Sequence, residues 1–288
     1  MNTSFDHIRY DVPMPRVARI SLARADARNA QNAQLLYELN DAFSLAASDD
    51  DVRCIVLCAD GPHFSAGHDL RDTSAIDVLD SRDPVGTWCG YHAAGVEGVM
   101  SQEKELFLGL SERWRNLPKP SIAAVQGKAI SGGLMLVWPC DLIVAAEDAQ
   151  FLDITVEMGI PGAEFFHHPW ELPSRIAKEM LFASRSVGAH EAYRLGMVNH
   201  VVPVAELMER TLELASRVAS RPSLALRLAK ESVNAAQDAQ GRASSMAIAF
   251  AHHQLGHSHY QQLHGTMIDP EFLARPAARA GQASEHAP

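Results

Sequence analysis

Long apolar runs, positive charge and cysteine are all scarce in this sequence. No segment is apolar over the roughly 20 residues that span a bilayer, and Met1 to Asp11 lacks the apolar stretch of a signal peptide. Against 35 Asp and Glu there are only 25 Lys and Arg, a formal charge of −10, which argues against non-specific binding to nucleic acid or anionic membranes. The four cysteines form no C-x-x-C pair. We therefore expect a cytoplasmic protein with reduced cysteines.

Alternating strand-like and helix-like segments indicate an α/β protein with one large core. Small and β-branched residues dominate the runs at 54–58 and 121–125, which predicts buried strands, while 31–47 carries apolar residues at helical spacing. Two glycines, Gly196 and Gly256, are expected to end or break helices. Further strands are expected at 8–11, 17–22 and 141–146, and further helices at 107–117, 134–140, 171–184, 189–195, 206–220 and 224–236.

Two loops of small residues follow two of these strands. The first is His63–Leu70, and the second is Gln126–Met135, with a Ser-Gly-Gly step at the start of a helix. The first N–H groups of a helix have no carbonyl partner within it and favour negative charge. If each loop offers one N–H to the same oxygen atom, the pair forms an oxyanion hole. A tight turn that merely packs closely is the alternative interpretation of either loop alone.

The motifs of these loops resemble those of the enoyl-CoA hydratase/isomerase (crotonase) superfamily. Ser65–Leu70 is similar to the A-G-x-D-[LI] loop of that family, Ala129–Gly133 to its second glycine-rich loop, and Gly196–Pro203 to its G-L-V-x-x-V-V-P segment. The resemblance runs in order from Ile8 to Phe272. It implies the crotonase (ClpP-like) fold of repeated ββα units with a C-terminal helical region. It also implies an acyl-CoA substrate, no cofactor beyond that coenzyme A, and a homotrimer or dimer of trimers. The charge of the chain separately predicts no nucleic-acid or membrane partner, and the histidine pattern described below predicts no metal.

The same resemblance implies a division of the chain and a set of binding residues. We expect a core domain at 1–203, a helical trimerisation region at 204–275 and a disordered tail at 276–288. The oxyanion donors would be the N–H groups of His68 and Gly132. Other expected substrate contacts are Ala66, Asp69 and Leu70 in the first loop, Ala27 and Arg28 at the coenzyme A adenine and phosphates, and Phe272 and Arg275 in the tail.

The acid–base groups depart from the family pattern. Hydration of a conjugated thioester requires a base for water and an acid for the α-carbon, and family hydratases use two carboxylates. By alignment these positions are Met135 and Thr155, which would still contact the substrate but cannot perform this proton transfer. The usual mechanism with two glutamates is therefore in doubt.

Glu164 is the leading substitute for the missing carboxylates. It follows Ile160–Ala163, which in the family lies beside the acyl end of the pocket, and its apolar neighbours suit a carboxyl group that transfers protons. The alternative is a structural acid at a helix N-terminus. Asp153 and Glu157 share strand parity with Thr155, so all three are expected to face the pocket together. The histidines His167 and His168 are more simply interpreted as packed side chains.

Two further segments leave alternatives open. The interval 71–118 is longer than is typical of the family and contains Trp88, Tyr91 and Phe107, which suggests either a lid over a bulky aromatic or cyclic acyl group or a surface elaboration. Within it, His92 is expected to be structural. His253 and His257 have the i, i+4 spacing of metal ligands. Because no carboxylate accompanies them in sequence and Gly256 is expected to break the helix, we predict no metal site there.

The predicted function is an enoyl-CoA hydratase-type lyase of fatty acid metabolism, in which the oxyanion hole stabilises an enolate. An isomerase, decarboxylase or thioester hydrolase on the same fold is the first alternative, because one base and an oxyanion hole are enough for isomerisation. A non-catalytic acyl-CoA binder is the second alternative, since intact loops would also serve binding.

Overall fold

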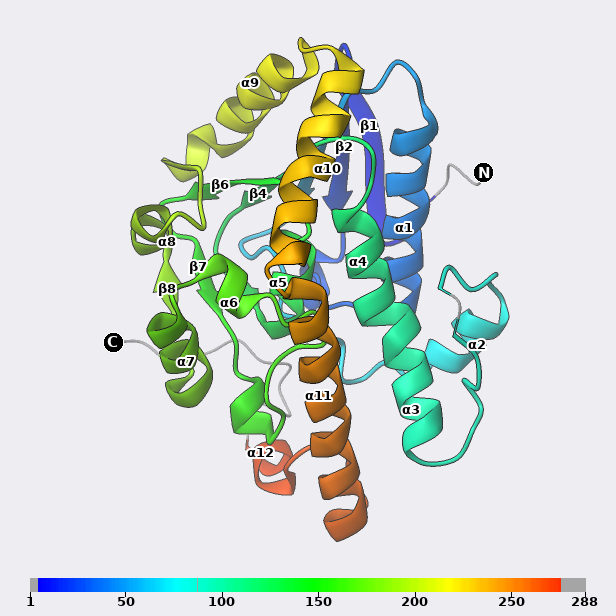
Figure 1. Cartoon of the computed structure of the whole chain (residues 1–288). Coiled ribbons are helices and arrows are strands. Elements are labelled where there is room, and N and C mark those ends of the chain that lie inside the picture. Colours follow the sequence, from blue (N-terminus) through cyan, green and yellow to red (C-terminus); the bar gives the residue numbers. More distant parts are fainter. Residues whose placement is uncertain (1–4, 87, 276–288) are drawn as a thin grey trace.

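A six-stranded sheet lies at the centre of the computed structural model, which describes residues 5–86 and 88–275 (Figure 1). Its strand order is β1-β2-β3-β4-β6-β9. The first two strands form an antiparallel hairpin, and every later neighbour pairs in parallel. Parallel neighbours require crossover connections, and both faces of such a sheet must be covered. The central strands β3 (Cys54–Ala59) and β4 (Ser121–Val125) are accordingly apolar and almost wholly buried.

A second, three-stranded sheet carries the glycine-rich loop. Strand β5 (Lys128–Ile130) pairs in parallel with β7 (Gln150–Leu152), which pairs antiparallel with β8 (Val187–Gly188). The short helices η3 (Ser131–Gly133) and α5 (Leu134–Val137) follow β5 directly. Successive strand pairs followed by helices give the repeated ββα arrangement that the sequence predicts.

Helices cover the two faces of the main sheet and form two apolar clusters. The larger cluster packs α1 (Ala33–Ser48) and α4 (Leu110–Arg115) against one face, where Phe43 and Trp114 stack with ring centroids 5.5 Å apart. The second cluster packs α9 (Leu207–Ala219) on the opposite face through Leu207, Ala215 and Ala219. Helix α9 thus contributes to the core of the sheet, although it lies beyond residue 203.

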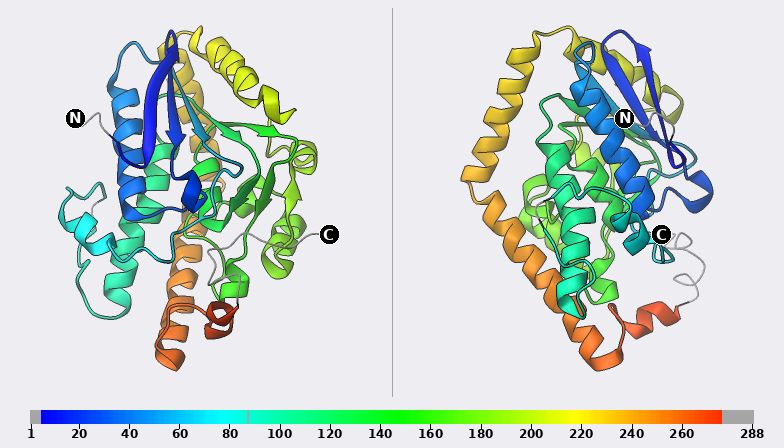
Figure 2. Two further views of the ribbon diagram at one scale, coloured as in Figure 1. Left: turned by 180° about the vertical axis from the view of Figure 1, so that it is seen from behind. Right: turned by 90° about the vertical axis from the view of Figure 1, so that its right-hand side faces the viewer.

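Two long helices, α10 (Ser223–Ala239) and α11 (Arg242–His264), form an arm that bends at their junction, as the right-hand view of Figure 2 shows. Gly241 forms the bend with φ +99°, a conformation that favours glycine. The expectation that Gly256 breaks the helix is wrong, because α11 continues through it. A Cβ at Gly256 would lie only 3.2 Å from Ile160 Cδ1, so glycine here permits close contact between α11 and the loop at 159–161.

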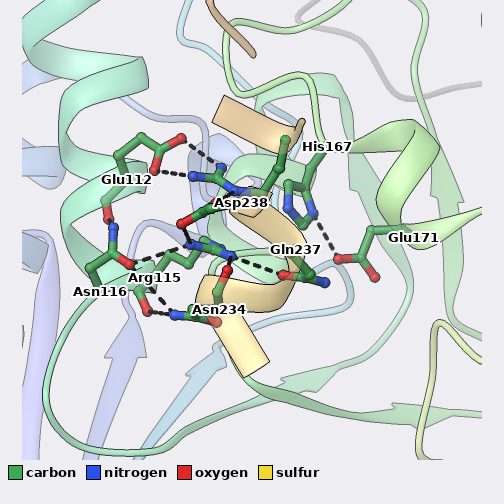
Figure 3. A network of polar contacts seen from close by, with 9 residues as sticks. Glu112, Arg115, Asn116, His167, Glu171, Asn234, Gln237 and Asp238 are labelled. Atoms are coloured by element: carbon green, nitrogen blue, oxygen red, sulfur yellow. Dashed lines mark hydrogen bonds and ion pairs between the residues drawn. The ribbon is translucent and has the colours of Figure 1, made fainter. Parts of the chain in front are cut away.

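A polar network fixes this arm to α4 (Figure 3). Arg242 donates two hydrogen bonds to Glu112, at 2.7 and 2.9 Å, and a third to Asp238. Arg115 donates to Gln237 at 2.9 Å and to the carbonyl of Asn234 at 3.3 Å. Both guanidinium groups are buried, and such groups are tolerated in an interior only when they are paired in this way.

The helix predicted at 107–117 is longer than expected. It begins with α3 (Val96–Glu103), passes through a π-helical segment η2 (Lys104–Gly109) and ends with α4. No helix in the two described ranges is both long and apolar enough to cross a membrane. The expected disordered tail, 276–288, lies outside the described residues. The remaining elements are β1 (Ile8–Met14), β2 (Val17–Leu22), β6 (Leu142–Ala146), β9 (His200–Val202), α2 (Ala75–Asp80), α6 (His168–Glu171), α7 (Ser174–Ala183), α8 (Ala189–Leu195), α12 (Pro270–Ala274), η1 (Ala25–Ala27), η4 (Thr155–Met158) and η5 (Val204–Glu206).

Candidate active site

The two small-residue loops lie side by side because they form a short β-bridge. Ser65 donates from its N–H to Lys128 O at 3.1 Å, and Ile130 donates from its N–H to Ser65 O at 3.0 Å. Glycines permit this contact: a Cβ at Gly67 would lie 2.8 Å from Ile130 O and 3.2 Å from Gly132 N. Gly67 also has φ +89°, which a larger residue adopts only with strain.

This contact brings together the amides of His68 and Gly132, which are the two predicted oxyanion donors. A second bridge fixes the first loop, since Gln31 N–H donates to Gly67 O and Asp69 N–H donates to Gln31 O. In a parallel bridge of this kind the intervening residue, His68, turns its N–H away from Gln31. A Cβ at Gly132 would lie 3.1 Å from His68 N, so the two amides are neighbours.

A cavity of about 350 Å³ opens beside these amides. Its walls come from six parts of the chain: the two loops, the α3–η2 helix, the segment 154–164, helix α11 and the C-terminal segment around α12. Most of the wall is apolar, with eight polar residues among its lining. Those residues are Asp69, Ser131, Thr155, His68, Glu103, Glu164, His253 and His257.

Glu164 is the predicted acid–base residue, and its carboxylate lies in this cavity. The residue is 2% exposed, and Oε2 has no hydrogen-bond partner among the residues that the structure describes. Oε1 lies 3.6 Å from His253 Nε2 and 3.7 Å from His68 Nδ1. A buried carboxylate that lines a cavity and has an oxygen without a partner can accept or donate a proton there.

The imidazole of His68 was not expected in the site, since the sequence suggested only a role for its backbone N–H. Its ring stacks on Phe107 with centroids 3.9 Å apart and planes 15° apart. Its Nε2 is buried and without a hydrogen-bond partner among the described residues. The side chain therefore forms part of the wall between the amide pair and Glu164.

The prediction that Asp153, Thr155 and Glu157 face the pocket together is wrong. Residues 155–158 form the 3-10 helix η4 instead of a strand, so only Thr155 lines the cavity. Glu157 forms an ion pair with Arg275 at 2.6 Å near the surface. The physical reason is that the carboxylate of Asp153 accepts from Thr155 N–H at 2.9 Å and thereby tightens the chain into a turn.

Asp153 is a structural carboxylate. Besides Thr155 N–H, it accepts from Ala163 N–H at 3.2 Å and contacts His168 Nε2 at 2.9 Å, and it is fully buried. Burial alone would raise its pKa, but the hydrogen bonds from His168 and Thr155 hold the pKa well below its usual range. A group so firmly ionised is a poor proton carrier, and its contacts instead fix the segment that ends at Glu164.

Of the expected substrate contacts, Ala66, His68, Asp69, Leu70, Gly132, Thr155 and Glu164 line the cavity. Met135 does not, because α5 turns its side chain into the main core. Phe272 packs in a small apolar cluster with Ile160 and Ile268. The segment with Ala27 and Arg28 borders the first loop, since the carbonyl of Arg28 accepts from Ala66 N–H at 3.0 Å. His92 lies at the surface and pairs with Asp80 at 2.8 Å.

Glu103 belongs to the site but was not predicted from the sequence. It lies at the end of α3, 3.1 Å from His257 Nε2 and 3.5 Å from His253 Nε2. The statement that no carboxylate accompanies these histidines is therefore wrong, because folding supplies one from another helix. Burial would raise the pKa of Glu103, but the hydrogen bond with His257 and the two imidazoles outweigh burial and lower it. Burial likewise opposes ionisation of His257, yet the Glu103 carboxylate raises its pKa.

Comparison with known proteins identifies relatives of the whole fold. The family model described as enoyl-CoA hydratase/isomerase matches residues 15–82 and 94–267. A Mycobacterium tuberculosis protein named as enoyl-CoA hydratase EchA13 is 44% identical over 91% of this chain and 84% of its own length. The 4-chlorobenzoyl coenzyme A dehalogenase-2 of an Arthrobacter species is 32% identical over 77% of this chain and 76% of its own. A crystal structure described as an enoyl-CoA hydratase from Mycobacterium smegmatis matches with a TM-score of 0.82 and 45% identity, over 91% of this chain and 98% of that one.

Proposed function

The chain belongs to the enoyl-CoA hydratase/isomerase family and has its crotonase fold, and from that premise we propose a reaction and a set of residues for it. It is an enoyl-CoA hydratase-like enzyme, and its substrate is an α,β-unsaturated acyl-CoA thioester. The observation that carries the assignment is the position of Glu164, whose carboxylate shares one cavity with the paired amides of His68 and Gly132.

The thioester carbonyl binds between these amides. Both N–H groups donate to the oxygen and bind it more strongly as it gains negative charge in the enolate. The amides lie on rigid elements, a bridged loop and the first turn of a helix, so they need little rearrangement when that charge develops. Because the donors are backbone groups, this step does not depend on a titratable side chain.

Glu164 performs the proton transfers that the residues Met135 and Thr155 cannot. As a carboxylate it takes a proton from the water that attacks the β-carbon, and as a carboxylic acid it returns a proton to the α-carbon. Water thus adds across the double bond with one group in both roles. The free Oε2 of Glu164 and its position beside His68 support this assignment.

Isomerisation is the second candidate reaction. It requires only that one base remove a proton at one carbon and return it to another, while the same amides hold the enolate. The absence of both standard glutamates favours this alternative. Decarboxylation and thioester hydrolysis have no specific observation in their favour.

The acyl group is bulky. The family model leaves residues 83–93 unmatched, which supports an elongated segment here. The N–H groups of Val85 and Gly86 in this segment donate to Glu105, on the same helix as Phe107, which lines the cavity.

The protein assembles as a trimer or a dimer of trimers. This assembly is supported by exposed apolar side chains along α10 and α11, among them Leu224, Val233 and Leu255, which another copy of the chain would bury. Size-exclusion chromatography with light scattering tests this assembly.

Mass spectrometry on a panel of unsaturated acyl-CoA esters tests the reaction. We expect a gain of one water in the product, lost in Glu164→Gln and kept in the control Glu147→Gln, which alters an exposed carboxylate of similar type. A product of unchanged mass with a moved double bond makes the enzyme an isomerase. Release of free coenzyme A makes it a hydrolase. Tight binding of every ester without turnover refutes the catalytic assignment and leaves an acyl-CoA binder.

A further inference from the structure

Three buried side chains converge on one point in the wall of the cavity. They are Glu103 from the end of α3 and His253 and His257 from one face of α11, exposed by 7%, 4% and 8%. The two Nε2 atoms lie 2.9 Å apart, and the carboxylate oxygens of Glu103 lie 3.1 Å from His257 Nε2 and 3.5 Å from His253 Nε2. Each residue thus directs a ligand atom at the same small volume.

The backbone sets the tautomer of both histidines. His253 Nδ1 lies 2.7 Å from the carbonyl of Gly162, and His257 Nδ1 lies 2.6 Å from the carbonyl of Met267. A carbonyl only accepts, so both Nδ1 atoms carry hydrogen and donate it. A bound metal ion would displace the proton that Glu103 favours on His257 Nε2, and the Nε2 lone pairs of the two neutral rings would then be directed into the cluster. Metal-binding histidines are oriented by this same outer contact to a carbonyl.

A shared proton does not account well for the contact between the two Nε2 atoms. In a straight N–H···N bond at 2.9 Å the ring centroids would lie about 5.3 Å apart, since each centroid is roughly 1.2 Å from its nitrogen. The observed separation of the centroids is 4.6 Å, with the ring planes at 82°. The rings are therefore bent away from the line that joins the nitrogens, as they are when both lone pairs are directed at a third atom.

The distances match those around a small divalent cation. Ligand atoms about 2.1 Å from a metal, at angles between a right angle and the tetrahedral angle, lie roughly 3.0–3.4 Å from one another. The two Nε2 atoms lie 2.9 Å apart, Oε1 of Glu103 lies 3.1 Å from His257 Nε2, and Oε2 lies 3.5 Å from His253 Nε2, all close to that range. Gln254 donates to Oε2 of Glu103 and holds the carboxylate in place.

We propose that Glu103, His253 and His257 bind a divalent first-row transition metal, with Zn²⁺ the best match. Two imidazoles and one carboxylate are a ligand set that zinc favours in sites with an open position. The open side faces Glu164, whose Oε1 is 3.6 Å from His253 Nε2 and whose Oε2 is buried without a partner among the described residues.

This proposal reverses the prediction from sequence that the chain holds no metal. It also differs from a purely structural zinc site, which is closed by four protein ligands. Here the ion would border the cavity, with Glu164 between it and the oxyanion loops. The proposal does not depend on which reaction the enzyme performs, since metal content is measured without substrate.

The test is metal analysis of the full chain, prepared without a histidine tag. After purification, elemental analysis gives the zinc content, and chelation followed by dialysis gives the metal-free protein. Co²⁺ is then titrated in, because its visible absorption reports the geometry of its ligands, and Zn²⁺ is used in competition. We expect about one metal per chain and a cobalt spectrum of low coordination number.

Matched variants locate the site. Glu103→Gln keeps the shape of the side chain and removes its charge, and His257→Gln removes one imidazole. Each should weaken Co²⁺ and Zn²⁺ binding by about 100-fold or more. His252→Gln is the control, since His252 is an exposed histidine on the same helix. Circular dichroism of the metal-free variants shows that each is folded, and Glu103→Gln alone suffices if His257→Gln does not fold.

Two results would overturn the proposal. One is a wild-type protein that holds no metal as purified and binds Co²⁺ and Zn²⁺ no more tightly than His257→Gln does. The other is binding that Glu103→Gln leaves unchanged while His252→Gln weakens it, which would place the ion at the helix surface. Loss of hydratase activity in Glu164→Gln with unchanged metal content would support the proposed function alone, so the two proposals fail separately.

Discussion

Replacement of Gly132 by alanine should remove most of the turnover while the chain stays folded. The new Cβ would lie 3.1 Å from His68 N, tighter than most real contacts of a Cβ atom, so it pushes the His68 amide away from that of Gly132. It would also lie 2.5 Å from His68 Cδ2, closer than real contacts allow. The imidazole has little room to move, because its ring is stacked on Phe107 at 3.9 Å.

The size of the effect follows from the loss of one donor. Removal of a single oxyanion-hole donor lowers kcat by about 10²–10³, which corresponds to about 2.7–4 kcal/mol of transition-state stabilisation. The overpacked methyl group should lower the free energy of unfolding by about 1–3 kcal/mol, which is less than the total stability of an ordinary domain. The helical backbone of η3 itself accepts alanine, so no backbone strain adds to this cost.

The measurement is kcat on the best ester of the panel, together with a urea denaturation curve. Gly188→Ala is the matched control, because a Cβ there meets no atom within 4 Å. We expect its kcat to equal that of the wild type, with a stability loss within about 1 kcal/mol from the changed helix cap. A Gly132→Ala enzyme that stays folded and keeps kcat within about threefold of wild type would refute the assignment of this amide pair as the oxyanion hole.

Three further predictions concern parts of the fold around the site. Arg242→Met removes the two hydrogen bonds to Glu112, at 2.7 and 2.9 Å, from a largely buried network. Urea denaturation should therefore show a free energy of unfolding lower by about 3 kcal/mol, and a decrease below about 1 kcal/mol would contradict the role of that pair. The pKa of Asp153 is lower in the folded than in the unfolded chain, so its contribution to stability is complete above about pH 4 and is lost as the pH falls further. Thermal denaturation of Asp153→Asn should therefore change less between pH 6 and pH 3 than that of the wild type, and equal changes would contradict this. Arg275→Ala breaks a half-exposed ion pair with Glu157 and should cost less than about 1 kcal/mol. If Arg275 contacts coenzyme A, its loss raises KM for the ester while Glu157→Gln does not, and equal KM values would remove Arg275 from the binding residues.

Elements with a strong local signal were predictable from the sequence. The strands at 54–59 and 121–125 fall where runs of small and β-branched residues stand, and α8 (Ala189–Leu195) occupies the predicted residues. The loops at 63–70 and 126–135 could be identified because their glycines are required by close contacts, such as that of Gly67 with Ile130 O at 2.8 Å. These features depend on neighbours in the chain or on a shared motif, and both are visible in one sequence.

The segment from Asp153 to Glu157 was mispredicted because a side chain competes with the strand. An alternating pattern favours a strand, but the carboxylate of Asp153 captures the N–H of Thr155 two residues later, and Gly159 then ends the turn at φ +83°. Both interactions are local, and an aspartate with a glycine six residues later could have suggested a turn. Which pattern prevails depends on His168 and Ala163, whose contacts with Asp153 exist only after folding.

The pairing of Glu103 with α11 has a different origin, since no local signal joins residues that are 150 positions apart. It depends on the continuity of α11 through Gly256, which the sequence favours as a break because glycine is a poor helix former. In the fold the missing side chain is what matters: α11 approaches the loop at 159–161 so closely that a Cβ at Gly256 would lie 3.4 Å from Gly159 O. The glycine that weakens the helix as a local structure thus allows its contact with the site. That contact positions His253 against Gly162 O at 2.7 Å and both histidines against Glu103. Gly256 was a reason to predict no metal site from the sequence, yet the proposed site requires it.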